Sequence, residues 1–234
     1  MAANEIALGL LWFLAFLFST TVHEAMHAWV AMRGGDLTAY QAGQVSLSPI
    51  PHIRREPFGM LVLPLLTAVT QGWAIGWASA PYDPHWAARY PKRAAWMAAA
   101  GPAGNLLIAV GSFTLLKLGL LGGWFVAPPV ANFHTLVASG AGEGLGGIGT
   151  ALSILLVLNV FLAVFNLMPL PPLDGAAVLG LFVPENQMDR LRAIVHQPWA
   201  QLVGLLIAWK IFPFLTGPLF GLLLRLLHPT EGYS

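Results

Sequence analysis

The sequence contains no cysteine, and only 9% of its 234 residues are charged. Without thiols the chain has no disulfide and no thiolate metal site, so any bound metal must be held by His, Asp or Glu. The formal net charge is +1 and no basic stripe runs along the sequence, which excludes nucleic acid as a partner. Soluble domains carry charge on roughly a quarter of their residues, so the scarcity of charge also argues against a soluble protein.

Apolar residues take the place of the missing charges. They make up 57% of the chain, and the mean hydropathy is +0.70. This composition predicts a multi-pass integral membrane protein in contact with the lipid bilayer. The remaining polar stretches are too short to bury a core of their own, so we expect one membrane domain over residues 1–234, with a core at 6–183 and a C-terminal membrane region at 199–227. Nothing in the sequence indicates an oligomeric state.

Four apolar runs reach the length of about 20 residues that a membrane helix needs: Ile6–Met32, Phe58–Ala80, Ala94–Leu121 and Thr150–Leu170. The first run lacks the basic start and the small-residue cleavage site of a signal peptide, and we expect it to be retained as a helix. A fifth apolar region, Trp199–Leu227, is broken by Pro213 and by Gly217-Pro218. It predicts either a hairpin of two half-helices or one kinked span.

Lysine and arginine orient these runs. Six of them lie between Met32 and Ala94, whereas residues 122–149 contain none. Cytoplasmic loops are rich in Lys and Arg, so we expect the first stretch in the cytoplasm and the second outside. Both flanks of Phe58–Ala80 are then cytoplasmic, which predicts a re-entrant segment; a simple spanning helix is the alternative. In a prokaryote the membrane would be the cytoplasmic membrane.

The stretch Gly43–His52 shows a different pattern. Polar and apolar residues alternate along QVSLS at positions 44–48, and this period of two is typical of a strand. Pro49 and Pro51 would end the strand. The predicted fold is therefore an all-α polytopic membrane protein with a core of three transmembrane helices, a re-entrant and short β element, and C-terminal membrane helices.

Two histidines and a glutamate interrupt the first apolar run, in the sequence HEAMH. His23 and His27 are four residues apart, so on a helix both imidazoles project to one side and can bind one zinc ion. Glu24 lies beside them, within reach of a water at the metal, as in HExxH metallopeptidases. An ionisable group at membrane depth costs about 3 kcal/mol on insertion scales, so three together indicate a function. The alternative is that the three side chains only satisfy one another within the bundle.

A catalytic zinc ion needs a third protein ligand. That ligand must lie at membrane depth on the cytoplasmic side, at the level of HEAMH. Asp174 meets this condition because it follows the run Thr150–Leu170, which leads inward from the outer loop. His52 and His85 are substitutes, although both lie among prolines and charged residues in loops.

Three motifs together resemble the site-2 proteases, which are intramembrane zinc metallopeptidases. The motifs are HEAMH, NLMPLPPLDG at Asn166–Gly175 and AAGPAGNLLIA at Ala99–Ala109. The resemblance implies one zinc ion per chain, held by His23, His27 and Asp174. It further implies that Glu24 is the acid and base and that Asn166 is a polar group near the metal, where it holds the substrate or its oxyanion. The implied substrate is a membrane protein, cut within or near a transmembrane segment from the cytoplasmic side.

The chain departs from the family pattern at two positions. Met26 and Ala176 stand where many members have glycine, but neither glycine carries chemistry. The sequence has no room for the PDZ or CBS domain that some members carry, so it resembles a minimal form of the family.

Prolines explain how Asp174 would reach the metal. Pro169, Pro171 and Pro172 cannot continue a helix, so the helix before them must end there. The unwound backbone then presents Asp174, and Gly175 permits close approach of the chain.

Several alternatives stay open. A prenyl-protease-type zinc peptidase would need a downstream glutamate ligand, for which Glu185 is the candidate after the motif. A catalytically inactive scaffold that binds transmembrane helices would have no use for Glu24. Asn105 is a second candidate for an oxyanion donor, although Asn105 and Asn159 are of a kind that commonly just bridges helices. Either the predicted strand or the re-entrant segment would bind an unwound substrate by strand addition.

Overall fold

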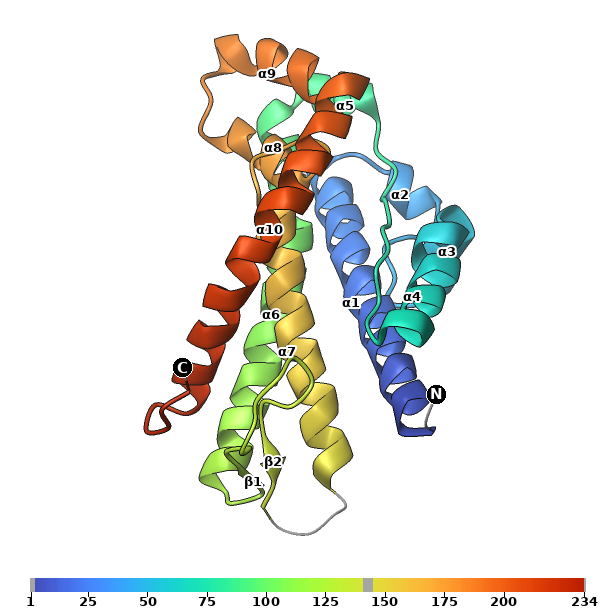
Figure 1. Cartoon of the computed structure of the whole chain (residues 1–234). Helices are drawn as coiled ribbons and strands as arrows, with labels where there is room; N and C mark the ends of the chain where they lie inside the picture. Colours follow the sequence, from blue (N-terminus) through green and yellow to red (C-terminus); the bar gives the residue numbers. More distant parts are fainter. Residues whose placement is uncertain (1–2, 141–144, 234) are drawn as a thin grey trace.

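The computed structural model describes residues 3–140 and 145–233, and helices dominate it (Figure 1). Four of the described helices are long and apolar enough to cross a membrane: α1 (Ala3–Gly34), α6 (Pro91–Leu121), α7 (Gly146–Asn166) and α10 (Pro198–Leu227). This confirms the prediction of an all-α polytopic membrane protein. α7 begins and ends earlier than the predicted run Thr150–Leu170, so all three prolines of the NLMPLPPLDG motif, called the proline motif below, lie beyond its end.

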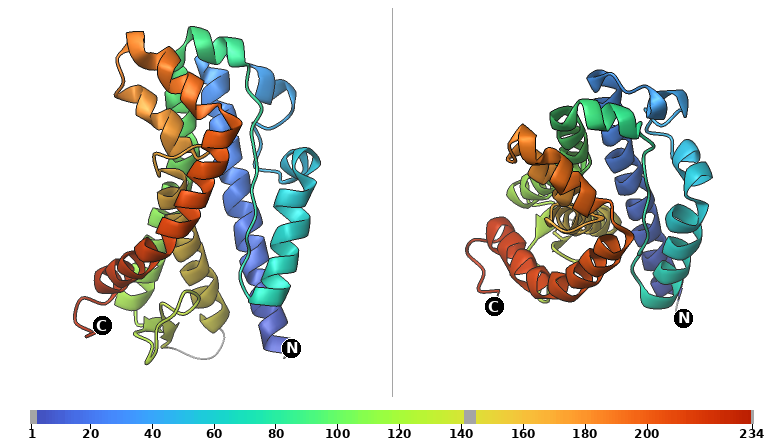
Figure 2. Two further views of the ribbon diagram at one scale, coloured as in Figure 1. Left: turned by 45° about the horizontal axis from the view of Figure 1, so that its top comes forward. Right: turned by 90° about the horizontal axis from the view of Figure 1, so that it is seen from above.

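Helix α6 lies at the centre of the bundle, with α1 and α7 packed against it (Figures 1 and 2). Lipid is as apolar as a leucine side chain, so such helices associate through close packing and small residues. Gly104 of α6 provides such a contact, because a Cβ atom there would lie 2.9 Å from Cγ of Met26 in α1. Farther along, Leu116 of α6 and Leu156 of α7 are fully buried in a cluster that also includes residues of α10.

The C-terminal region forms one continuous helix, α10, rather than a hairpin of two half-helices. Pro213 and Pro218 lie inside it, and the helix bends along its length (Figure 2). A proline removes one backbone hydrogen bond and crowds the preceding turn, which accounts for a bend without a break. Much of the apolar surface of α10, including Leu206 and Phe214, is exposed and suited to contact with lipid.

The predicted re-entrant segment enters and leaves the bundle at the same end (Figure 1). The predicted segment Phe58–Ala80 follows α3 (Ile50–Arg55) and begins with a π-helix η1 (Phe58–Val62) and α4 (Leu63–Gln71). The chain turns at Gly72, whose φ of +78° suits glycine. Residues 73–83 then return without helix or strand, held where the Ile75 amide donates to Thr67 Oγ1 and the Trp77 amide donates to the Gly59 carbonyl. The alternative of one spanning helix over Phe58–Ala80 is therefore wrong.

The strand predicted within Gly43–His52 is absent, so that prediction was wrong. Residues 43–49 lie between α2 (Thr38–Gln41) and α3 and fold into turns, and residues 50–52 form the start of α3. Serine side chains here accept hydrogen bonds from backbone amides that would otherwise be free to pair with a neighbouring strand. Ser46 Oγ accepts from the Ser48 amide, and Ser48 Oγ accepts from the Ile50 amide. Short hydroxyl side chains often compete with strand pairing in this way.

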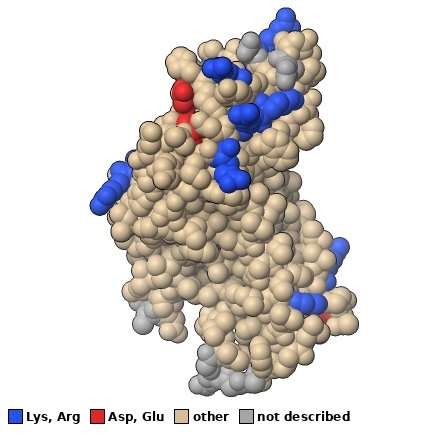
Figure 3. All heavy atoms as spheres, turned by 180° about the vertical axis from the view of Figure 1, so that it is seen from behind, with Lys and Arg blue, Asp and Glu red and all other residues tan. Residues whose placement is uncertain are grey.

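The remaining elements lie at the two ends of the bundle (Figure 1). One end carries α5 (Pro84–Arg89), α8 (Asp174–Val178), two 3-10 turns, η3 (Leu179–Leu181) and η4 (Glu185–Gln187), and α9 (Met188–Val195). The other end carries the short antiparallel pair of β1 (Phe125–Val126) and β2 (Ala138–Ser139). On the face shown in Figure 3, Lys and Arg gather mainly over the end of α5 and α9, and the middle of the molecule is largely free of charge.

Candidate metal centre

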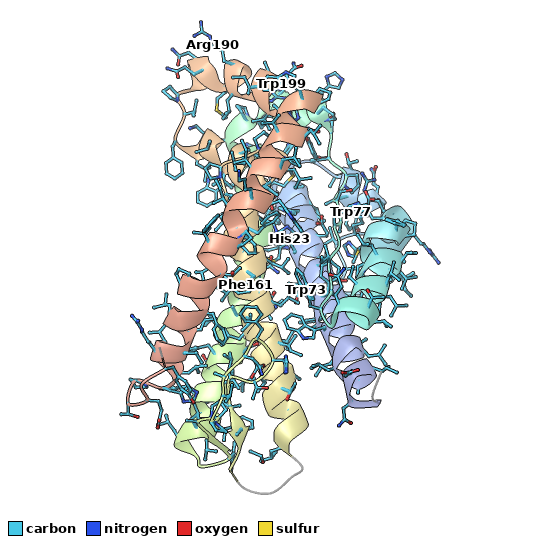
Figure 4. All side chains as sticks on the ribbon, in the orientation of Figure 1. His23, Trp73, Trp77, Phe161, Arg190 and Trp199 are labelled. Carbon is cyan, nitrogen blue, oxygen red and sulfur yellow. The ribbon has the colours of Figure 1, made fainter. Side chains whose placement is uncertain are left out.

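The HEAMH motif lies on α1, and its three polar side chains are buried. His23, Glu24 and His27 are only 7%, 4% and 7% exposed. The i, i+4 spacing brings the two imidazoles together as expected, with the two Nε2 atoms 3.0 Å apart. Figure 4 places His23 well inside the bundle, away from the end that carries Arg190.

Asp174, the first residue of α8, brings its carboxylate to the same point. Its Oδ2 atom lies 3.2 Å from His23 Nε2 and 3.4 Å from His27 Nε2. In a tetrahedral zinc site with bonds of about 2.0–2.1 Å, two ligand atoms lie about 3.3–3.4 Å apart. Oδ2 is buried and makes no hydrogen bond to any of the described residues, an arrangement that is costly unless a cation satisfies it. The three donor atoms therefore fit a single zinc ion.

Gly101 of α6 keeps the space beside these donors open. A Cβ atom at this position would lie 2.6 Å from His23 Nε2 and closer still to His27 Nε2. Any residue larger than glycine would therefore occupy the space at the nitrogen atoms. Gly101 lies within the AAGPAGNLLIA motif, but its place at the imidazoles was not predicted. The available signal was its position inside a long helix, where a glycine costs about 1 kcal/mol relative to alanine and so indicates a packing requirement.

The proline motif delivers Asp174 as predicted. α7 ends at Asn166, and Met168–Leu173 forms turns that include a cis Pro171–Pro172 peptide. Gly175 lies so close under the end of α7 that a Cβ atom would collide with the carbonyls of Leu167 and Met168. Gly175 thus allows a close approach of the chain to the end of α7, and its predicted part in bringing Asp174 to the metal stays a prediction.

The far end of α8 is fastened to the beginning of α6. Lys92 Nζ donates hydrogen bonds to the carbonyls of Gly180, Leu181 and Val183, at 3.0, 3.0 and 2.9 Å. These carbonyls follow α8 directly, so the ammonium group holds the element that carries Asp174 against the helix that carries Gly101.

Glu24 lies next to the ligand atoms, with a carboxylate oxygen within 4.8 Å of the imidazole nitrogens. Asn166 lies at the last residue of α7, where its amide donates to the Leu162 carbonyl at 2.9 Å. That bond leaves its carbonyl oxygen and one amide hydrogen for other contacts, and its role at the metal stays a prediction.

The other candidates lie elsewhere. His52 on α3 contacts the Ser46 carbonyl, His85 on α5 is exposed, and neither belongs to the described cluster of metal-ligating groups. The side chain of Glu185 lies outside the described part of the structure. Asp174 therefore lies at the position where the prenyl-protease alternative would need a glutamate.

Outside the membrane-spanning helices, Asp36 ties the chain just beyond α1 to the start of α5. Its carboxylate accepts from the amide and hydroxyl of Thr38, at 2.9 and 2.6 Å, and from the Asp83 amide at 2.8 Å. Burial by itself raises the pKa of the Asp36 carboxyl, but these hydrogen bonds favour the charged form more strongly and lower the pKa below its usual value.

Comparison with known proteins agrees with this geometry. Residues 11–210 match the model for peptidase family M50. The chain belongs to peptidase family M50. Together with the four apolar helices, membership of this family confirms the predicted membrane metallopeptidase of the site-2 protease type.

The M50 relatives include bacterial proteins named as zinc enzymes. The chain is 33% identical over 73% of its length to "Putative zinc metalloprotease YwhC" of Bacillus subtilis, covering 68% of that protein. It is 30% identical over 80% of its length to "Putative zinc metalloprotease Rip2" of Mycolicibacterium smegmatis and 28% identical over 88% to Rip2 of Mycobacterium tuberculosis, covering 62% and 68% of those proteins. No solved structure matches the chain. The names of these relatives agree with the predicted zinc.

Proposed function

We propose that this M50 peptidase is an intramembrane zinc endopeptidase that hydrolyses peptide bonds within or near transmembrane segments of other membrane proteins. The convergence of three donor atoms, His23 Nε2, His27 Nε2 and Asp174 Oδ2, within 3.0–3.4 Å of one another is the observation that carries the proposal. These donors come from an apolar bundle, so a substrate that reaches them must itself enter the membrane.

Each residue of the cluster has a separate role in the proposed reaction. His23, His27 and Asp174 would hold one zinc ion, which when bound polarises the scissile carbonyl and lowers the pKa of water to about 7. Glu24 takes a proton as the water oxygen bonds to the carbonyl carbon. It then delivers that proton to the amide nitrogen as the C–N bond breaks. Asn166 is proposed to donate a hydrogen bond to the substrate or its oxyanion.

A transmembrane helix hides its peptide bonds, so the substrate must be unwound before it is cut. The returning segment 73–83 supports a way to hold it. Successive amides of an extended chain point to opposite sides. The Ile75 and Trp77 amides bond back to α4 and η1, so the amide of Gly76 between them is expected to point away from those elements. Figure 4 shows His23 at a level along the bundle between Trp73 and Trp77. We propose that this edge binds the unwound substrate by strand addition.

The orientation follows from the distribution of charge. Arg89, Lys92 and Arg93 lie on α5 and at the start of α6, and Arg190 and Arg192 lie on α9, at the same end of the bundle. By the positive-inside rule we propose that this end faces the cytoplasm, with the cluster opening toward it.

Two variants test the proposal. Wild-type protein purified in detergent is expected to contain about one equivalent of zinc, and Asp174→Ala is expected to lose it. Glu24→Gln is expected to keep the zinc and lose cleavage of a reporter membrane protein, because the donor set is intact but the base is gone. If Glu24→Gln cleaves as well as the wild type, the chain is better described as a scaffold for membrane helices. If Asp174→Ala retains its zinc, the ligand assignment is wrong.

A further inference from the structure

A chain of buried amide side chains connects the metal cluster to the far side of the core. His23 Nδ1 lies 2.6 Å from Asn105 Oδ1 of α6, and Asn105 Nδ2 lies 2.8 Å from Asn159 Oδ1 of α7. Asn159 Nδ2 in turn lies 2.8 Å from both Ser19 Oγ and the Leu155 carbonyl. Asn105, Asn159 and Ser19 are all 0% exposed, so water does not compete for these bonds.

The direction of every bond in this chain is set at its far end. The Leu155 carbonyl can only accept, so the side of the Asn159 amide that faces it must be the NH₂ group. The opposite side of Asn159 is then its oxygen, and that oxygen faces Asn105. Asn105 must therefore donate to that oxygen from its own NH₂ group, which also approaches the Ser19 carbonyl at 3.4 Å.

The orientation of Asn105 determines which ring nitrogen of His23 carries the proton. With its NH₂ group turned toward α7, Asn105 presents only its oxygen to His23. His23 Nδ1 must therefore carry the proton, and the neutral ring keeps the lone pair on Nε2, the atom that faces Asp174. His27 reaches the same state more simply, because its Nδ1 lies 2.7 Å from the Met97 carbonyl. One ligand is thus oriented by a backbone carbonyl directly, and the other through two side chains.

We infer that Asn105 and Asn159 are positioning residues for the zinc ligand His23. The Leu155 carbonyl fixes the orientation of the Asn159 amide, Asn159 fixes that of Asn105, and Asn105 holds the imidazole in the tautomer that binds metal through Nε2. This inference rests on the proposed zinc site. It also means that both ends of the Asn105 amide are engaged, so Asn105 is not the free oxyanion donor considered from the sequence.

Zinc affinity of the detergent-purified protein, measured by competition with a chromogenic chelator, tests this inference. Asn105→Leu removes the acceptor at Nδ1 and is expected to weaken zinc binding about 10–100-fold, the usual cost of losing such a partner. Asn105→Asp restores an acceptor for the Nδ1 proton and is expected to recover most of the affinity. Asn159→Leu leaves the acceptor but removes its orienting partner, so a smaller loss is expected.

A matched control separates positioning from simple support of the bundle. Ser153 of α7 is also 0% exposed and also links elements, since its hydroxyl donates to the Gly149 carbonyl and accepts from the Leu136 amide. It has no connection to His23 in this network. Ser153→Ala is therefore expected to lower resistance to unfolding and to leave zinc affinity unchanged.

A direct measurement covers the case in which Asn105→Leu does not fold. In metal-free wild-type protein labelled with ¹⁵N-histidine, NMR is expected to show the His23 proton on Nδ1, assigned by its loss in His23→Ala. A His23 ring protonated on Nε2 and not on Nδ1 would overturn the inference, as would an Asn105→Asp variant that binds zinc no better than Asn105→Leu. If His23→Ala keeps its full zinc, the ligand assignment fails instead, and the two failures are distinguishable.

Discussion

The two halves of the bundle are held together in different ways. Around the metal donors, glycines bring rigid groups together: Gly101 faces the ligand imidazoles, Gly175 faces two backbone carbonyls, and Gly204 of α10 faces the Pro171 carbonyl. In the half near β1 and β2, large side chains such as Leu116 and Leu156 fill the core, and a Cβ atom at the buried Gly119 would meet the ring of Phe125; the exposed Gly140 beside β2 does approach the Gly123 carbonyl, but it lies outside that core. A backbone carbonyl or a fixed ligand cannot move aside as a free side chain can, so the metal half should tolerate far less change.

The largest effect is expected from one added methyl group at the metal. Gly101→Ala places a Cβ atom against both Nε2 atoms, so zinc and peptidase activity should be lost together. Gly111→Ala is the matched control in the same helix, since a Cβ atom there meets nothing within 4 Å. Zinc content by elemental analysis checks both variants. Full zinc in Gly101→Ala would show that the metal half adapts as readily as the other half.

The opposite half should respond in stability and not in metal binding. Leu116→Ala leaves a cavity at a 0% exposed site and is expected to cost about 2–5 kcal/mol of unfolding free energy. Because the site lies in the other cluster, the zinc content of the folded protein should equal that of the wild type. Titration with denaturing detergent measures the first quantity and elemental analysis the second. Zinc loss in folded Leu116→Ala would contradict the division into two halves.

A moderate effect is expected where α8 is fastened to α6. Lys92→Met removes hydrogen bonds to three carbonyls, and bonds to charged groups contribute about 1.5–3 kcal/mol each when well formed. Because Lys92 is partly exposed, we expect the loss of unfolding free energy to lie near the lower limit of this range. Zinc binding should also weaken, because α8 is held less firmly. Lys210→Met, at an exposed lysine of α10, provides the control. Equal zinc affinity in the two variants would show that α8 is held by packing alone.

The smallest effect should appear only in acid. The lowered pKa of Asp36 means that its hydrogen bonds stabilise the fold fully above the unfolded value of about 4, and that this contribution is lost as the pH falls through the folded value. Unfolding followed at several pH values below about 5 should therefore show a steeper acid loss in the wild type than in Asp36→Asn. Parallel curves for the two proteins would show that the hydrogen bonds of the Asp36 carboxylate do not contribute to the pH dependence of stability.

The re-entrant segment and the predicted strand show how far local patterns reach. Lysine and arginine on both flanks of Phe58–Ala80 predicted a segment that returns to its own side, and the structure has that path. Alternation over 44–48 predicted a strand, but a strand needs a partner, and five residues of alternation say nothing about one. The serine side chains bound the backbone amides locally, and turns formed instead.

The sequence by itself determined the membrane class, the helical character and the candidate ligands His23, His27 and Asp174. These follow from local properties: apolar length, the spacing of residues along one helix, and prolines that must end another. Only the tertiary structure decided that Gly101 faces the imidazoles and that Asn105, 82 positions from His23, accepts from its ring. Such contacts depend on how closely α1, α6 and α7 pack and on their rotation about their axes, and residues distant in the chain do not record that relation in any local pattern.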